Sequence, residues 1–315
     1  MKSPMSNEVN SSIAFSADEL LNLAIMTKTS IIIVEGIDDV PIYERISLSV
    51  DIECDIYASE TLYGKREGCN GVIENISEIR LVSSGISIEK YVLGIIDRDV
   101  RFYRNEMPGD PAIFTLNYYS IESHYISLCS TKYLIPRFTN ATHKLIKESQ
   151  IKRIHDHSIQ HLEFLYYVSL EALKNACKRD YESEYGYSRP IKAIINQGLH
   201  EKIQAKRIEL DHFANELGLS NSIDSILKIC KGKWIHEVYS DILYDQIKKL
   251  PEDCFNSIIP RCQSCANGEP NKCLYRSPSF FNADMLRTHA FQNTDMKSLH
   301  YIKERLLAFA DQRPH

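Results

Sequence analysis

Acidic side chains follow two apolar segments of this 315-residue chain. Glu35 comes directly after the run 31–34, and Asp97 and Asp99 follow the segment 91–96. Mg²⁺ and Mn²⁺ prefer such carboxylate oxygens as ligands. Because Asp97 and Asp99 are two positions apart, an extended backbone would direct both toward one metal ion. Glu35 would share that ion or transfer a proton, and two ions would clamp the attacking and leaving oxygens of a phosphodiester.

Each acidic residue also has a structural explanation when it is taken alone. Acidic residues after strands commonly cap the following helix, and Asp38 and Asp39 directly precede an expected helix. A single carboxylate therefore decides nothing. Two apolar strands that each end in an acid, the second in a D-x-D, favour a metal site over coincidence.

Expected strands alternate with expected helices through the first half of the chain. β-branched or alternating apolar runs predict the strands, and apolar positions at helical spacing predict the helices. The expected strands are 31–34, 51–57, 91–96 and 112–116, and the expected helices are 16–29, 38–49, 71–82 and 121–129. This order implies right-handed crossovers and an α/β fold with a mainly parallel sheet flanked by helices. Ligands bind beyond the carboxyl ends of such strands, where Glu35 and Asp97 stand.

Long helical patterns without a clear strand follow from about residue 142. We therefore expect two domains, an α/β domain over 1–140 and a mostly helical region over 141–315. A Cys-rich loop at 254–273 interrupts the second region.

Four cysteines in that loop have the spacing C-x7-C-x2-C-x7-C, and they are Cys254, Cys262, Cys265 and Cys273. Four thiolates in a polar loop are typical of a structural Zn²⁺ site, and an iron–sulfur cluster is an alternative. Unrelated reduced cysteines are nearly as good an explanation, because the spacing departs from paired C-x2-C motifs. The other five cysteines lie in apolar patterns and are expected in the core.

Basic residues near the acidic motifs could contact phosphates. Lys65 and Arg66 lie in the Gly-rich stretch 64–71, and Arg98 and Arg101 flank the D-x-D. Phosphate contacts by Lys and Arg are generic, so an ordinary solvated surface charge is the better explanation for each residue taken alone.

The composition is that of a globular protein with a sizeable core, with 43% hydrophobic and 25% charged residues. The chain has no long apolar segment and no secretory signal pattern, so we expect no membrane contact and a cytoplasmic location with reduced thiols. The net charge of −5 divides unevenly: residues 1–140 hold 12 basic and 20 acidic residues, against 25 and 22 in the rest. An acidic half beside a mildly basic half fits a carboxylate site whose phosphate-binding surface comes largely from elsewhere.

The two acidic motifs together resemble a known family. The stretches I-I-V-E-G-I-D-D-V (32–40) and G-I-I-D-R-D (94–99) are similar to the signature of the Toprim domain of topoisomerases, primases and OLD-family nucleases. A closer resemblance is to the Toprim-like effector of PARIS-type anti-phage systems, whose third motif is a tyrosine-rich S-x-E segment. Here that segment is 118–123. The resemblance covers residues 30–130, about a third of the chain.

The resemblance implies a Toprim-like sheet and a metal-dependent nuclease that is a toxic effector of anti-phage defence. It implies restraint by an OLD- or ABC-like ATPase partner, a nucleic-acid substrate that includes RNA such as tRNA, and a homodimer as a further candidate assembly. Carried over by motif, Glu35 is the acid/base or a metal ligand and Asp39 an auxiliary carboxylate. Asp97, Asp99 and Glu122 are Mg²⁺ or Mn²⁺ ligands. Ser123 and His124 depart from the amide and aromatic residue that the family pattern has after this acid.

Two other functions fit the same residues. One is a non-catalytic Toprim-like regulatory or binding module, against which the complete set of acids argues. The other is a haloacid-dehalogenase-type phosphatase, in which an apolar strand also ends in D-x-D. Val100 is compatible with the phosphatase, but the motif around Glu35 would then be unexplained.

Overall fold

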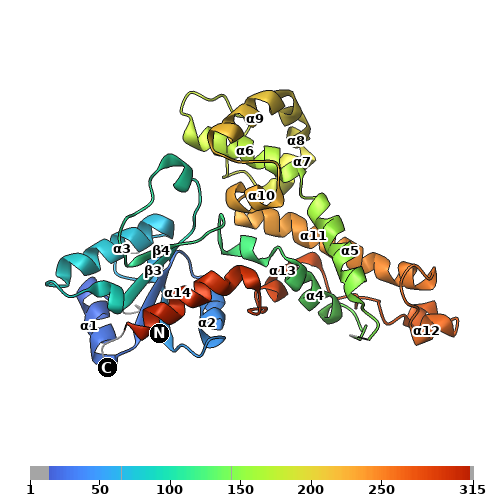
Figure 1. Ribbon diagram of the computed structural model, residues 1–315, viewed down its shortest axis with the longest axis horizontal. Helices are drawn as coiled ribbons and strands as arrows, with labels where there is room; N and C mark the ends of the chain where they lie inside the picture. The colour runs from blue at the N-terminus through green and yellow to red at the C-terminus, as the bar shows by residue number, and fades with distance from the viewer. Residues whose placement is uncertain (1–13, 65, 143, 313–315) are drawn as a thin grey trace, which may run out of the picture. The chain divides into compact units, whose positions relative to one another are not determined.

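The computed structural model describes residues 14–64, 66–142 and 144–312 (Figure 1). The chain folds into two compact units. Of the described residues, the first unit comprises those within 14–96, 109–114 and 306–312, and the second comprises those within 97–108 and 115–305.

A four-stranded sheet forms the centre of the first unit. Its strands are β1 (Ser30–Val34), β2 (Cys54–Ala58), β3 (Val92–Ile96) and β4 (Ile113–Thr115), in the order β2-β1-β3-β4. β1 is parallel to both neighbours, with Ser30 opposite Cys54 and Ile31 opposite Val92. Every residue of β1 and β3 is buried, which explains why both read as continuous apolar runs. The predicted α/β class with a mainly parallel sheet is confirmed.

Three helices accompany this sheet, α1 (Ala17–Thr27), α2 (Val40–Leu48) and α3 (Gly68–Val82). α1 begins with the predicted capping box, in which the Ser16 N–H donates to the Glu19 carboxylate at 2.9 Å. α3 packs closely on β3 because the strand has a glycine there: a Cβ atom on Gly94 would lie 2.7 Å from a methyl group of Val72.

The second unit is helical, and none of its described residues after Thr115 forms a strand. Its helices are α4 (Leu128–Leu134), α5 (Glu148–Gln160), α6 (Phe164–Cys177), α7 (Ile191–Asn196), α8 (Leu199–Lys202), α9 (Arg207–Glu216), α10 (Ile223–Ile229), α11 (Gly232–Phe255), α12 (Gln263–Ala266) and α13 (Ala283–Ala290). The last helix, α14 (His300–Asp311), belongs to the second unit up to Arg305 and to the first from Leu306. The predicted mostly helical C-terminal region is confirmed.

The division into units differs from the boundary that we placed at 140/141. Residues 115–140 belong to the helical unit, because the 3₁₀ segment Ile121–Tyr125 packs on α11 and α4 packs on α13. The helix expected over 121–129 is this 3₁₀ segment followed by α4, which begins only at Leu128. Among the described residues, no helix is long and apolar enough to cross a membrane.

Candidate functional site

Glu35 directly follows β1, and Asp97 directly follows β3. Since β1 and β3 are hydrogen-bonded parallel neighbours, both strands end at the same edge of the sheet. The Glu35 carbonyl accepts hydrogen bonds from the Ser59 hydroxyl at 2.8 Å and the Gly68 N–H at 3.2 Å. A Cβ atom on Gly68 (φ +67°) would lie 3.9 Å from Glu35 Oε2, so the half-buried carboxylate lies beside the first residue of α3.

Glu60 is an acidic residue at this edge that sequence reasoning missed. It follows β2, and its Oε1 accepts the Ile37 N–H at 3.0 Å, two residues beyond Glu35. Its Oε2 is enclosed and has no hydrogen-bond partner within the described part of the chain. An enclosed carboxylate oxygen without a donor is an atom that a bound cation would satisfy. The rule that pointed to Glu35, an acid after an apolar strand, also applies to Glu60, which comes after the expected strand 51–57.

Asp39 stabilises the turn between β1 and α2. Its Oδ2 accepts the Gly36 N–H at 3.1 Å and closes the turn between β1 and α2, where Asp39 is the N-cap residue. The sequence left both explanations open for this residue. Its hydrogen bond fixes the backbone directly after Glu35.

The backbone turns sharply at Asp99, which has φ +29°. One carboxylate oxygen of Asp99 accepts the Arg101 N–H at 2.6 Å, and the Asp99 N–H donates to the Tyr119 carbonyl at 3.2 Å. The extended backbone that we expected across 97–99 is therefore wrong, because the short Asp side chain closes a turn with the chain two residues on. Burial raises the pKa of Asp99, and the hydrogen bond from Arg101 acts in the opposite direction.

Half-buried Tyr301, which is hydrogen-bonded to the buried His124, feels the charge of Asp97. Burial raises the pKa of the Tyr301 hydroxyl, and the negative charge of Asp97 adds to that rise. Tyr301 accepts the Asn117 N–H at 2.9 Å and lies 2.7 Å from His124 Nε2. Burial lowers the pKa of His124 to about 4, so the imidazole is neutral at pH 7. Its Nδ1 faces the Ser120 carbonyl at 3.1 Å and carries the proton, which leaves Nε2 to accept the Tyr301 hydroxyl.

Glu122 lies at the start of the long helix α11. Its carboxylate accepts a hydrogen bond from the Ser120 hydroxyl. A Cβ atom on Gly232, the first residue of α11, would lie 2.4 Å from Glu122 Oε2. The positive end of the helix dipole favours a carboxylate at this position, which gives Glu122 a structural environment beside its predicted role as a ligand.

Three of the four predicted phosphate-binding residues contact other side chains of the protein. Arg66 forms ion pairs with Glu74 at 2.8 Å and Glu78 at 2.7 Å, both on α3. The Arg98 guanidinium lies 3.3 Å from the centre of the Phe102 ring. Arg101 Nε lies 3.9 Å from a carboxylate oxygen of Asp99. Lys65 lies outside the described residues.

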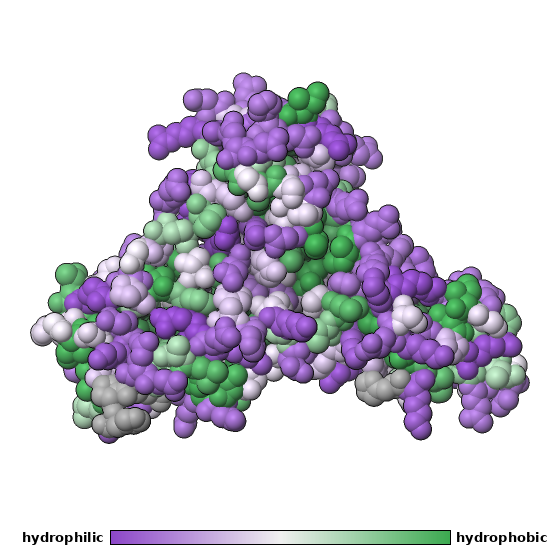
Figure 2. All heavy atoms as spheres, in the orientation of Figure 1, coloured by the Kyte–Doolittle hydropathy of each residue, from purple (hydrophilic) through white to green (hydrophobic). Residues whose placement is uncertain are grey.

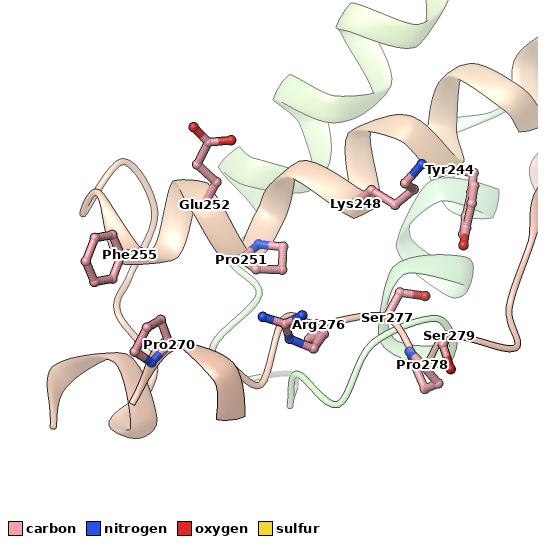
Figure 3. Close-up of a pocket in the computed structure, with 10 residues that line it drawn as sticks. All are labelled: Tyr244, Lys248, Pro251, Glu252, Phe255, Pro270, Arg276, Ser277, Pro278 and Ser279. Carbon is pink, nitrogen blue, oxygen red and sulfur yellow. The ribbon is translucent and has the colours of Figure 1, made fainter. Parts of the chain in front are cut away.

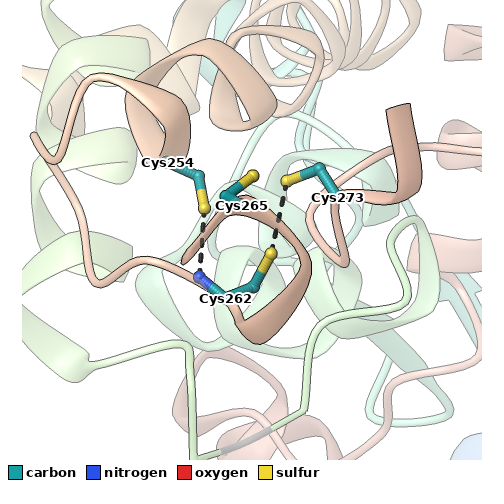
Figure 4. A group of neighbouring side chains, drawn as sticks. All are labelled: Cys254, Cys262, Cys265 and Cys273. Carbon is teal, nitrogen blue, oxygen red and sulfur yellow. Dashed lines mark hydrogen bonds between the residues drawn. The ribbon is translucent and has the colours of Figure 1, made fainter. Parts of the chain in front are cut away.

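The four cysteines of the C-x7-C-x2-C-x7-C loop come together in the second unit (Figure 4). Their sulfur atoms all lie within 4.8 Å of one another, and all four residues are buried. None of them forms a disulfide. Cys254 comes from the end of α11, Cys262 and Cys265 from the start and body of α12, and Cys273 from the loop that follows. The structure thus confirms that these residues form one cluster that could hold a metal ion.

Backbone N–H groups donate to two sulfur atoms of this cluster. The Cys262 N–H donates to Cys254 Sγ at 3.2 Å, and the Leu274 N–H donates to Cys262 Sγ at 3.5 Å. Burial raises the pKa of the Cys262 thiol, but hydrogen bonds from the N–H groups of Leu274 and Cys265 and contacts with neighbouring thiols lower it to about 7. Burial raises the pKa of the Cys254 thiol to about 11 and also raises the pKa of Cys273. Such hydrogen bonds to the ligand atoms are typical of metal sites.

Within the described residues, the four cysteines are the only group of three or more potential ligands whose atoms lie close enough together to hold a metal ion. The described acids at the sheet edge follow neighbouring strands but do not form such a group. A scan against protein-family models and a search of curated proteins found no match.

Proposed function

We propose that this chain is a Toprim-like, Mg²⁺- or Mn²⁺-dependent nuclease that cleaves phosphodiester bonds of RNA or DNA. One observation carries the proposal: the adjacent parallel strands β2, β1 and β3 are each followed by an acid. These acids are Glu60, Glu35 and Asp97. Open parallel sheets bind their ligands at that edge.

The donor set suits a hard divalent cation. The acids that follow these strands offer carboxylate oxygens, which are the ligand atoms that Mg²⁺ selects. The unsatisfied Oε2 of Glu60 is the structural sign that a positive charge belongs there. When bound, the metal would supply Lewis-acid stabilisation of the developing oxyanion. Glu35 would take or give a proton at the reacting oxygen, and Asp97 would help to hold the ion.

We propose further that the cysteine cluster holds a structural Zn²⁺. Four sulfurs about 2.3 Å from a tetrahedral zinc ion lie about 3.8 Å from one another. The Sγ atoms of Cys262 and Cys273 are 3.8 Å apart. A closed, buried four-thiolate set leaves no open position for a substrate, so its contribution would be to folding.

The biological setting follows from the resemblance alone. On that basis we propose a cytoplasmic effector of anti-phage defence that an OLD- or ABC-like ATPase restrains, with a homodimer as a candidate assembly. Co-purification of this chain with such an ATPase, and release of cleavage activity when the ATPase dissociates, would test the partner.

The nuclease is tested with the zinc-loaded protein, total cellular RNA and plasmid DNA in Mg²⁺, in Mn²⁺ and in metal-free buffer. We expect metal-dependent cleavage of at least one substrate. Glu35→Gln should abolish it, because the amide can neither transfer the proton nor carry the charge. Glu44→Gln, an exposed acid on α2, is the matched control and should cleave like the parent.

A phosphate monoester, p-nitrophenyl phosphate, distinguishes the phosphatase alternative. Metal-dependent hydrolysis of the monoester without cleavage of either nucleic acid would overturn the nuclease. Equal cleavage by Glu35→Gln and the parent would remove Glu35 from the mechanism.

A further inference from the structure

A cavity of about 560 Å³ lies in the second unit between the C-terminal part of α11 and the segment that follows the cysteine cluster (Figure 3). Its lining residues are Tyr244, Lys248, Pro251, Glu252, Phe255, Pro270, Arg276, Ser277, Pro278 and Ser279. None of them belongs to the acidic sheet edge. The cavity is large enough to take a group of the size of a nucleobase.

Two cations line this cavity. The exposed Arg276 guanidinium has no ion pair among the described residues, so its charge is available to a ligand. Lys248 Nζ lies 3.7 Å from an Asp245 oxygen and 5.5 Å from the centre of the Tyr244 ring. The one acid in the lining, Glu252, points away from the other lining side chains in Figure 3. The cavity is therefore suited to an anionic group.

Apolar and aromatic surface accompanies the cations. Phe255 is 49% exposed although it is a phenylalanine, and Phe280, next to the cavity residue Ser279, is 67% exposed. Figure 2 shows apolar residues exposed among hydrophilic ones around α12, in the same region. An exposed ring beside free positive charge is the combination that holds single-stranded nucleic acid, with the base stacked on the ring and the phosphate on the cation.

The cysteine cluster joins the two walls of the cavity. Phe255 directly follows Cys254 on α11, and Arg276 stands three residues after Cys273 on the facing segment. A metal ion bound by the four thiolates would fix the ring and the guanidinium relative to each other. This arrangement gives the cysteine cluster a part in ligand binding.

We propose that this cavity binds an unpaired nucleobase and its phosphate, and so holds a single-stranded segment of the substrate. The proposal rests on the proposed nuclease for its substrate class. The base would stack on Phe255, and the phosphate would pair with Arg276 and Lys248. An acidic peptide is the competing occupant, and it would use the charges without the ring.

The test is a binding measurement that needs no turnover. Fluorescence anisotropy of a labelled single-stranded RNA oligonucleotide is measured with zinc-loaded Glu35→Gln protein in Mg²⁺-free buffer. This protein is the parent of the variants below, and a failure of the nuclease proposal does not affect the measured binding. Phe255→Ala should weaken binding about 5- to 160-fold, the range for loss of one base–aromatic stack. Arg276→Ala should weaken binding and reduce the salt dependence by about one phosphate contact. Lys249→Ala, an exposed cation on α11 outside the cavity, is the control and should bind like the parent.

An abasic strand of the same length separates the two occupants. We expect the parent to bind the abasic strand more weakly than the base-containing strand. We expect Phe255→Ala to bind the two strands with the same affinity. Equal binding of both strands to the parent would overturn the proposal in favour of a polyanion site, as would an unchanged affinity in Phe255→Ala and Arg276→Ala. Absence of oligonucleotide binding by the parent would also overturn it.

Discussion

At the scale of single residues, the acidic side chains differ in the hydrogen bonds that they form within the protein. Asp39 and Asp99 each accept a backbone N–H two or three residues away, so their carboxylates are part of the local fold. Glu60 keeps one enclosed oxygen without a partner in the described chain. The sequence motif treats all these acids alike. Their hydrogen bonds make Glu60 a stronger candidate ligand than Asp99.

Glu60→Gln tests this ranking. Because a ligand carboxylate would be lost, we expect metal-dependent cleavage to fall at least about 10-fold, with the protein still folded. Asp99→Asn should cost less activity and more stability, since its oxygen closes a turn. Cleavage rates and melting temperatures of the two variants are measured together. A fully active Glu60→Gln would show that its enclosed oxygen has no part in metal binding.

The buried histidines make a separate prediction about acid stability. Burial lowers the pKa of His124 to about 4 and that of His236 to about 3, from an ordinary 6.5. Above pH 6.5 both folded and unfolded chains keep them neutral. Below that pH only the unfolded chain takes up the protons, so the free energy of unfolding falls toward acid pH, by about 1.4 kcal/mol per pH unit for each histidine.

Urea unfolding of the parent and of His124→Gln between about pH 6.5 and pH 5 measures this effect. The variant starts less stable because the bond to Tyr301 is lost, but its stability should depend less steeply on pH. An identical slope in the two proteins would mean that His124 is not held neutral in the folded state.

At the scale of elements, the buried strands were predictable because their composition leaves little choice. Ile31 to Val34 has only β-branched apolar residues, and the structure buries all of them. The turn at Asp99 was not predictable from spacing, because it depends on the Tyr119 carbonyl twenty residues later. The sequence also predicts an α-helix where the structure has the 3₁₀ segment 121–125. This segment packs on α11, which begins more than a hundred residues later, so local spacing does not reveal the contact.

The close packing of α3 on β3 depends on Gly94. A Cβ atom there would lie 2.7 Å from Val72 and 3.1 Å from Ile76 on α3. We expect Gly94→Ala to destabilise the protein by about 1–3 kcal/mol through overpacking, and to lower activity by displacing the end of β3. Gly109→Ala, where the added methyl meets no atom within 4 Å, is the control in thermal and urea unfolding. Equal stability of the two variants would show that α3 yields to the methyl group.

At the scale of the whole molecule, the sequence predicted an α/β half and a helical half. It did not predict which unit residues 115–140 and the end of α14 belong to. Residues 115–140 join the helical unit, and the end of α14 returns to the first unit from Leu306. Both assignments depend on contacts between distant segments, which local periodicity does not encode. The cysteine cluster is the opposite case, since its spacing alone predicted which four residues meet.

Zinc binding is tested by metal analysis of the purified protein. We expect about one Zn²⁺ per chain, and loss of that ion with a lower melting temperature in Cys265→Ser, because structural zinc contributes directly to folding. Cys129→Ser, at an exposed cysteine outside the cluster, should keep the zinc ion and the melting temperature of the parent. An equal zinc content in Cys265→Ser and the parent would contradict a four-thiolate site.

The central claim is that the acids after β1 and β3 hold one divalent metal ion. Titration of zinc-loaded protein with Mn²⁺, followed by electron paramagnetic resonance, tests it without any substrate. We predict that Glu35→Gln and Asp97→Asn each weaken binding of the same Mn²⁺ at least about 10-fold, whereas Glu44→Gln leaves it unchanged. Binding of Mn²⁺ that neither substitution alters would contradict the account.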